Sequence, residues 1–118
     1  MAESEATSAQ GVAAEESRTV SEDEVSQLDA RAEEAAIQLT GVTARINWGA
    51  KNGQWILTLN WSQISAGNQV YVSIHEGNFI GGARYTVHNI APFDGGVRIW
   101  VNIEWSSPIT LIADYLVV

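Results

Sequence analysis

The chain has 118 residues, 46% of them hydrophobic, which suits one domain with a buried core and is too short for two. It has no cysteine, which excludes disulfides, thiolate zinc sites and cysteine nucleophiles. A net charge of −8 argues against nucleic-acid binding, which needs a basic surface.

The charge is unevenly distributed. Residues 1–40 hold ten acidic residues against Arg18 and Arg31, whereas residues 41–118 hold four acids, four bases and all five tryptophans. The N-terminus lacks the basic start and apolar run of a signal peptide, and no segment has the ~18–20 apolar residues of a membrane span. We therefore expect a cytoplasmic protein without a membrane span; the sequence is also compatible with non-classical export.

The acidic leader divides into two parts. Residues 1–20 are rich in Ala, Ser, Glu and Thr and are predicted to be a disordered acidic tail. Residues 21–40 are predicted to be an amphipathic α-helix, because Ser21 to Glu24 fits a capping box and Gly41 is a natural stop. Its apolar stripe is narrow and consists of Val25, Leu28, Ala32, Ala35, Ala36 and Leu39. A stripe of this kind must pack on the body or on another copy to be stable.

From Gly41 onward the apolar residues alternate with polar ones, which is typical of strands with one buried face. Turn-forming residues separate six such runs, as in Asn52-Gly53 and Gly95-Gly96. The runs cover about 42–48, 55–61, 70–75, 83–89, 99–105 and 109–118. The sequence therefore predicts a mainly β domain over residues 41–118, a six-stranded antiparallel β-sandwich or small barrel.

The alternation also assigns faces to the tryptophans. It places Trp48, Trp55, Trp61 and Trp105 in the core and Trp100 on the opposite face of its strand. The last run ends in bare apolar residues, 116–118, which we expect to form an exposed edge. Exposed edges pair with other chains, so the sequence favours a homo-oligomer.

A first candidate surface surrounds Trp100. An exposed tryptophan beside polar residues is typical of sugar stacking or of a protein interface, although the predicted helix could instead cover it. The residues expected on this surface are Arg98, Trp100, Asn102, Glu104 and, on the second strand, Ile56.

A second candidate surface involves the two histidines. If the third and fourth strands pair with residue numbers summing to 159, then His75 faces Arg84, Ser73 faces Thr86 and Tyr71 faces His88. Such a face suits a sugar or a peptide; the alternative is an ordinary solvated sheet face. The two imidazoles would lie diagonally apart, so we expect no metal site.

No stretch has the pattern of a catalytic site. The serines lack a nucleophile-elbow pattern, the carboxylates of the body are scattered, and the glycine pairs belong to turns rather than to a phosphate-binding loop. We therefore expect no enzyme and no cofactor. The hypotheses, in order, are a non-enzymatic binding or self-assembly module that engages a protein partner or itself, a small carbohydrate-binding lectin, and a membrane-active pore-forming protein. The acidic helix has the wrong polarity for anionic lipid, which places the last of these third.

Overall fold

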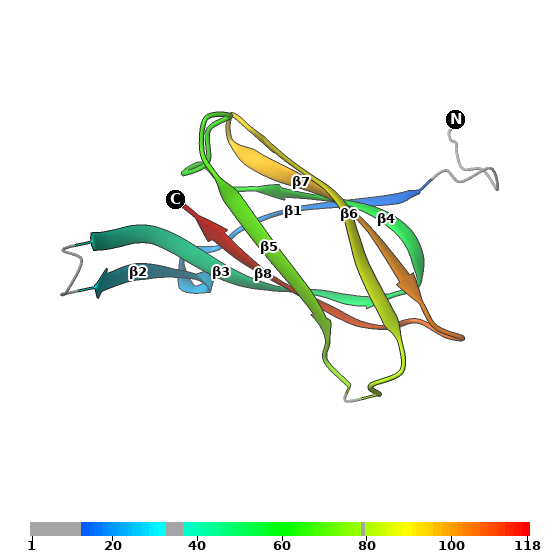
Figure 1. The fold of residues 1–118 in the computed structure, drawn as a ribbon. Coiled ribbons are helices and arrows are strands. Elements are labelled where there is room, and N and C mark those ends of the chain that lie inside the picture. Colours follow the sequence, from blue (N-terminus) through cyan, green and yellow to red (C-terminus); the bar gives the residue numbers. More distant parts are fainter. Residues whose placement is uncertain (1–12, 33–36, 79) are drawn as a thin grey trace.

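The computed structural model describes residues 13–32, 37–78 and 80–118 and shows a mainly β fold (Figure 1). Eight strands occur in these ranges. They are β1 (Ala14–Thr19), β2 (Val25–Ala32), β3 (Ile37–Lys51), β4 (Gly53–Asn60), β5 (Val70–Glu76), β6 (Arg84–Phe93), β7 (Gly96–Glu104) and β8 (Ile109–Val117). The mainly β prediction is thus confirmed, but the predicted count of six strands is wrong: the six predicted strands correspond to β3 to β8, and β1 and β2 are additional.

The strands form two four-stranded sheets. Sheet 1 has the order β1-β4-β7-β6 and sheet 2 has the order β2-β3-β8-β5. All pairings are antiparallel except that of β1 with β4, which is parallel. The chain passes from one sheet to the other between β1 and β2, β3 and β4, β4 and β5, β5 and β6, and β7 and β8 (Figure 1).

The core lies between the two sheets and is made by alternate residues of the central strands. In β7 the residues Val97, Ile99, Val101 and Ile103 are at most 1% exposed. β8 contributes Ile109, Leu111, Ala113, Tyr115 and Val117 from the other side. Burying each large aliphatic side chain stabilises the fold by about 1.5–3 kcal/mol. Because successive side chains of a strand point to opposite faces, the residues between these positions face outward. The two outer faces are therefore where a ligand could meet polar side chains.

The predicted helix over residues 21–40 is wrong. Ser21 and Glu24 do form the capping box, but it closes a single 3₁₀ turn, Glu22–Glu24. β2 begins at the next residue, Val25, and pairs with β3. The alanine stripe offers little area to bury, whereas a strand gains ladder hydrogen bonds from β3 and packs Val25 against the core. Residues 33–36 lie outside the described residues.

The prediction of disorder is also wrong for residues 14–19, which form β1 beside β4. Residues 1–12 lie outside the described residues. Ion pairs hold β1 in place: Glu16 Oε1 lies 2.8 Å from Lys51 Nζ, and Arg18 Nη2 lies 2.7 Å from Glu24 Oε2. Lys51 is only 6% exposed, donates to the Trp48 carbonyl at 2.6 Å and lies 4.6 Å from the ring centroid of Trp55. This strand is thus attached by its ladder to β4 and by ion pairs rather than by apolar burial.

The expected exposed C-terminal edge is wrong as well. β8 lies between β3 and β5, and Val117 pairs with Val42 on one side and with Val70 on the other. The last strand was predicted from its own composition, whereas its position in the sheet depends on which strands flank it. β8 therefore offers no bare edge for pairing with a second copy of the chain.

The tryptophans follow the alternation with one exception. Trp48 and Trp61 are buried, and Trp55 packs against the core. Trp100 is half-buried on the outer face of sheet 1, as predicted. Trp105 is 37% exposed instead of buried, because β7 ends at the preceding residue and the alternation ends with it.

Candidate functional site

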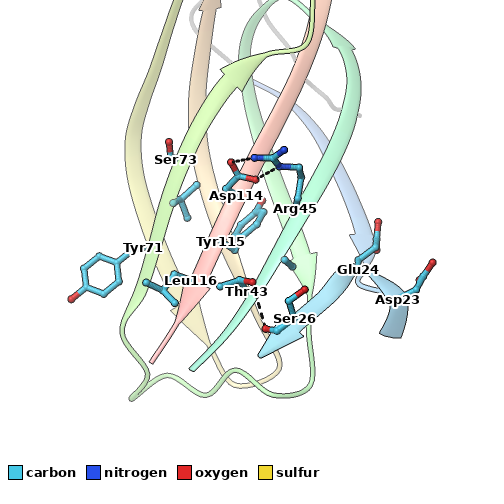
Figure 2. Close-up of a pocket in the computed structure, with 12 residues that line it drawn as sticks. Asp23, Glu24, Ser26, Thr43, Arg45, Tyr71, Ser73, Asp114, Tyr115 and Leu116 are labelled. Atoms are coloured by element: carbon cyan, nitrogen blue, oxygen red, sulfur yellow. Dashed lines mark hydrogen bonds and ion pairs between the residues drawn. The ribbon is translucent and has the colours of Figure 1, made fainter. Parts of the chain in front are cut away.

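A groove of about 750 Å³ lies on the outer face of sheet 2 (Figure 2). This volume is within the range of about 300–1,000 Å³ that is usual for small-molecule sites. The 3₁₀ turn and all four strands of sheet 2 contribute to its wall. The lining residues are Asp23, Glu24, Ser26, Thr43, Ala44, Arg45, Tyr71, Val72, Ser73, Asp114, Tyr115 and Leu116.

Strand register brings the polar members together. Asp114 of β8 lies between Arg45 of β3 and Ser73 of β5, one directly opposite on each side. In the next outward-facing row, Leu116 lies between Thr43 and Tyr71. Side chains directly opposite one another are neighbours in an antiparallel sheet. The groove therefore has one row with the charged residues Arg45 and Asp114 and a second row that ends at the aromatic ring of Tyr71.

Arg45 and Asp114 form a bidentate pair at the centre of the groove. Nε of the arginine lies 2.6 Å from Oδ1, and Nη2 lies 3.1 Å from Oδ2 (Figure 2). The hydrogen bonds from Arg45 hold the pKa of Asp114 below its usual value, and the pKa of Arg45 is raised in return. Water screens this exposed pair, so it contributes little to stability. Its effect is to fix donors and acceptors in one geometry.

His75 completes the charged cluster without forming a catalytic set. Its Nε2 lies 3.3 Å from Asp114 Oδ2, and its Nδ1 lies 3.0 Å from the Glu76 carbonyl oxygen. Both ring nitrogens are thus engaged, and neither is directed at the Ser73 hydroxyl. A hydrolase needs a base in contact with its nucleophile, and these three side chains do not provide that contact.

The two sides of the groove differ in character. On the β5 side Tyr71 is 56% exposed, and its hydroxyl donates to Gln69 Oε1 at 3.1 Å. On the opposite side lie Asp23 and Glu24 (Figure 2). The Ser21 backbone N–H donates to Glu24 at 2.9 Å and is the main reason why the pKa of Glu24 is lowered. The groove therefore runs from an aromatic edge to an acidic edge.

The nine residues predicted from the sequence lie on two opposite faces. Two of them lie on sheet 2: Tyr71 lies beside the polar cluster, and His75 belongs to it through its contact with Asp114. The others belong to strands of sheet 1, namely Ile56, Arg84, His88, Arg98, Trp100, Asn102 and Glu104.

The predicted pairs His75–Arg84, Ser73–Thr86 and Tyr71–His88 are wrong, because β5 pairs with β8 and β6 pairs with β7. The loop between β5 and β6 carries the chain from one sheet to the other rather than folding it into a hairpin. Tyr71 and His88 are therefore on different sheets.

Sequence reasoning missed Arg45 and Asp114, which are 69 positions apart. One signal was available: each is the single charged residue of an otherwise uncharged run, Arg45 within 41–50 and Asp114 within 109–118. A lone charge at an outward position of an apolar strand marks the exposed face. It does not reveal which other strand lies beside it.

Among the described residues, no three or more His, Asp or Glu side chains gather as a metal site. The part of the chain that the structure describes contains no helix long and apolar enough to cross a membrane. No protein-family model, no curated protein and no solved structure matches this chain. The site must therefore be interpreted from its own chemistry.

Proposed function

We propose that this chain is a non-enzymatic binding module that takes an oligosaccharide in the groove of sheet 2. The observation that carries the proposal is the Arg45–Asp114 pair beside the exposed ring of Tyr71. Each sugar hydroxyl both donates and accepts, so a fixed guanidinium next to a fixed carboxylate can bind neighbouring hydroxyls of one ring. An aromatic ring packs against the apolar C–H face of a pyranose.

The remaining lining supports a neutral sugar. Ser26, Thr43 and Ser73 add hydroxyl groups that can serve as donor or acceptor. Asp23 at the rim disfavours phosphate, sulfate and carboxylate groups, whereas the charge of Glu24 is offset by its ion pair with Arg18. We therefore expect neutral oligosaccharides to bind better than acidic ones.

A glycan array that carries neutral, sialylated and sulfated oligosaccharides tests this proposal. We expect the native chain to bind neutral glycans, and Arg45→Gln and Tyr71→Ala to lose at least about tenfold in affinity, as for the loss of one charged hydrogen bond or one stacked ring. Arg84→Gln is the matched control, because Arg84 is an exposed arginine on the other sheet. Absence of binding by the native chain, or equal loss in the control, would contradict the proposal.

A protein partner is the second candidate. Ile80 and Trp105 are each 37% exposed, and the Trp105 ring lies against Gly82, so the loops after β5 and β7 meet at one end of the sandwich. Exposed aromatic and aliphatic side chains that lie close together are common at protein interfaces. Sedimentation over a concentration series tests the self-association form of this candidate, and Trp105→Ser should abolish any association that is seen.

The pore-forming hypothesis required a helix that leaves the body. β2 and β3 occupy most of that segment, so this hypothesis is not retained.

A further inference from the structure

Sheet 1, which lies on the other side of the sandwich from the groove, contains a β-bulge in β6. Between β6 and β7, Val87 pairs with Val101 and Asn89 pairs with Trp100, which leaves His88 as an extra residue in β6. A bulge bends its strand and changes the direction of a side chain, and such features are common beside binding sites. Here the extra residue is an exposed histidine next to a tryptophan.

This bulge borders a small pocket of about 180 Å³. The pocket is lined by Ala13, Gln54, Trp55, His88, Trp100 and Val101. Trp100 is half-buried, and it lies between Ile56 of β4 and Asn89 of β6 in the sheet. The neighbouring strands thus flank Trp100, which lines the pocket and remains partly exposed.

The lining combines an aromatic surface with polar groups of both kinds. Trp100 supplies an indole, Gln54 supplies an amide with two donors and an acceptor, and His88 supplies an imidazole. Among the residues that the structure describes, no acidic side chain lines the pocket. A single pyranose ring matches this set, because its C–H face can pack on the indole while its hydroxyls bond to the amide and the imidazole.

We propose that this pocket is a second carbohydrate site, which takes one sugar residue against Trp100. The proposal rests on the proposed function for the class of ligand, but it uses a different face and different residues. Because the two sites lie on the outer faces of opposite sheets, they point away from each other. One chain would then bridge two glycans, and its binding to a multivalent surface would be strengthened by avidity.

The test uses the indole N–H signals of the five tryptophans in a ¹H–¹⁵N NMR spectrum of the full chain, with Trp100→Phe to assign the signal of interest. The probes are the methyl glycosides of glucose, galactose, mannose, N-acetylglucosamine and fucose. We expect at least one glycoside to shift the Trp100 signal, and this shift should persist in Arg45→Gln. His88→Ala and Gln54→Ala should each remove it. The Trp61 indole, which donates to Gln63 away from this pocket, should not move.

The outcomes separate the two sites. Shifts at the Arg45 side-chain N–H without a shift at Trp100 would overturn the second site and leave the groove intact. A shift at Trp100 without any effect at Arg45 would support the second site and contradict the groove. No response at either position to any glycoside would overturn both. A Trp100 shift caused by phenylalanine amide but by none of the glycosides would assign the pocket to an aromatic peptide and overturn the sugar proposal.

Bridging has its own readout. We expect the native chain to precipitate a neoglycoprotein that carries many copies of the glycoside that shifts the Trp100 signal. Arg45→Gln and His88→Ala should each abolish precipitation. Sedimentation should show that the native chain and both variants are monomers. Precipitation by a monomeric His88→Ala chain would show that Trp100 is not one of two bridging sites. Unchanged indole signals of Trp48 and Trp61, which are buried and do not line this pocket, confirm that each variant is folded.

Discussion

The strands at the centre of the sandwich and the strands at its N-terminal edge are held by different forces. β7 and β8 bury an alternate set of large apolar side chains, such as Ile99 and Leu111, at 0% exposure. β1 presents Glu16 and Arg18 to ion pairs with Lys51 and Glu24. The central strands are therefore specified by their own pattern of residues, whereas β1 depends on its ladder with β4 and on charged partners that are remote in sequence or follow the strand.

This difference explains where sequence reasoning succeeded. An alternating apolar pattern is visible within a single strand, so β7 was predicted from its own residues. A strand held by ion pairs looks like a polar, acidic segment, and such composition usually indicates disorder. The same contrast predicts how the two regions respond to substitution.

The largest effect is expected in the core. Ile99→Ala removes three carbons from a fully buried position between the two sheets, which should lower the free energy of unfolding by about 2–5 kcal/mol. Ile112→Ala is the matched control, because Ile112 lies on β8 at an outward, partly exposed position. Urea denaturation measures both variants. Equal losses in the two would show that the alternation does not decide which side chains support the fold.

A smaller, local effect is expected at β1. Glu16→Gln removes the carboxylate that pairs with the buried ammonium of Lys51, so β1 should detach more often while the rest of the sandwich stays folded. Amide hydrogen exchange in residues 14–19 should become roughly five times faster, as expected for the loss of about 1 kcal/mol from a partly exposed pair. The neighbouring Glu15→Gln, at an exposed position, should leave exchange unchanged. Uniform acceleration over all strands would instead mean that β1 unfolds only with the core.

The failure at residues 21–40 has a more specific cause. Val25, Leu28 and Ala32 recur at helical spacing, but Leu28, Ala30 and Ala32 also alternate as in a strand. The local pattern alone does not decide between a helix and a strand, whereas pairing with β3 selects the strand. The capping box at Ser21 was real, but a cap shows where a turn begins and not how long the helix runs.

The candidate site shows the same limit at longer range. Tyr71 and Trp100 could be selected from the sequence, because each is an aromatic residue at an outward position of a predicted strand. Arg45 and Asp114 could not be joined, because their contact depends on the order β3-β8 in sheet 2. Outward residues can thus be predicted one strand at a time, but a site made across strands requires the sheet order.

The smallest effect is the pH dependence of stability, which compares Asp114 of the groove with Glu24 of the N-terminal turn. The folded-state pKa is lowered for Asp114 by Arg45 and for Glu24 mainly by the Ser21 amide, from ordinary values of 3.8 and 4.5. A carboxylate with a lowered folded pKa stabilises the fold fully above its ordinary value. This contribution is lost as the pH falls through the lower folded value. Both groups should therefore stabilise the fold fully down to their ordinary pKa values, 4.5 for Glu24 and 3.8 for Asp114, and lose this contribution as the pH falls further through the lowered folded values.

Thermal unfolding between pH 7 and pH 2 measures this effect. Asp114→Asn should be slightly less stable than the native chain at neutral pH, and the difference should shrink as the pH falls below 3.8, because the native carboxylate is then becoming neutral too. Glu15→Gln, which changes an exposed carboxylate on β1, is the control for a general change in charge. If the difference between Asp114→Asn and the native chain instead grew in acid, the ionised form of Asp114 would be destabilising. The Arg45–Asp114 pair would then be a strained arrangement rather than one fixed in advance to receive hydroxyl groups.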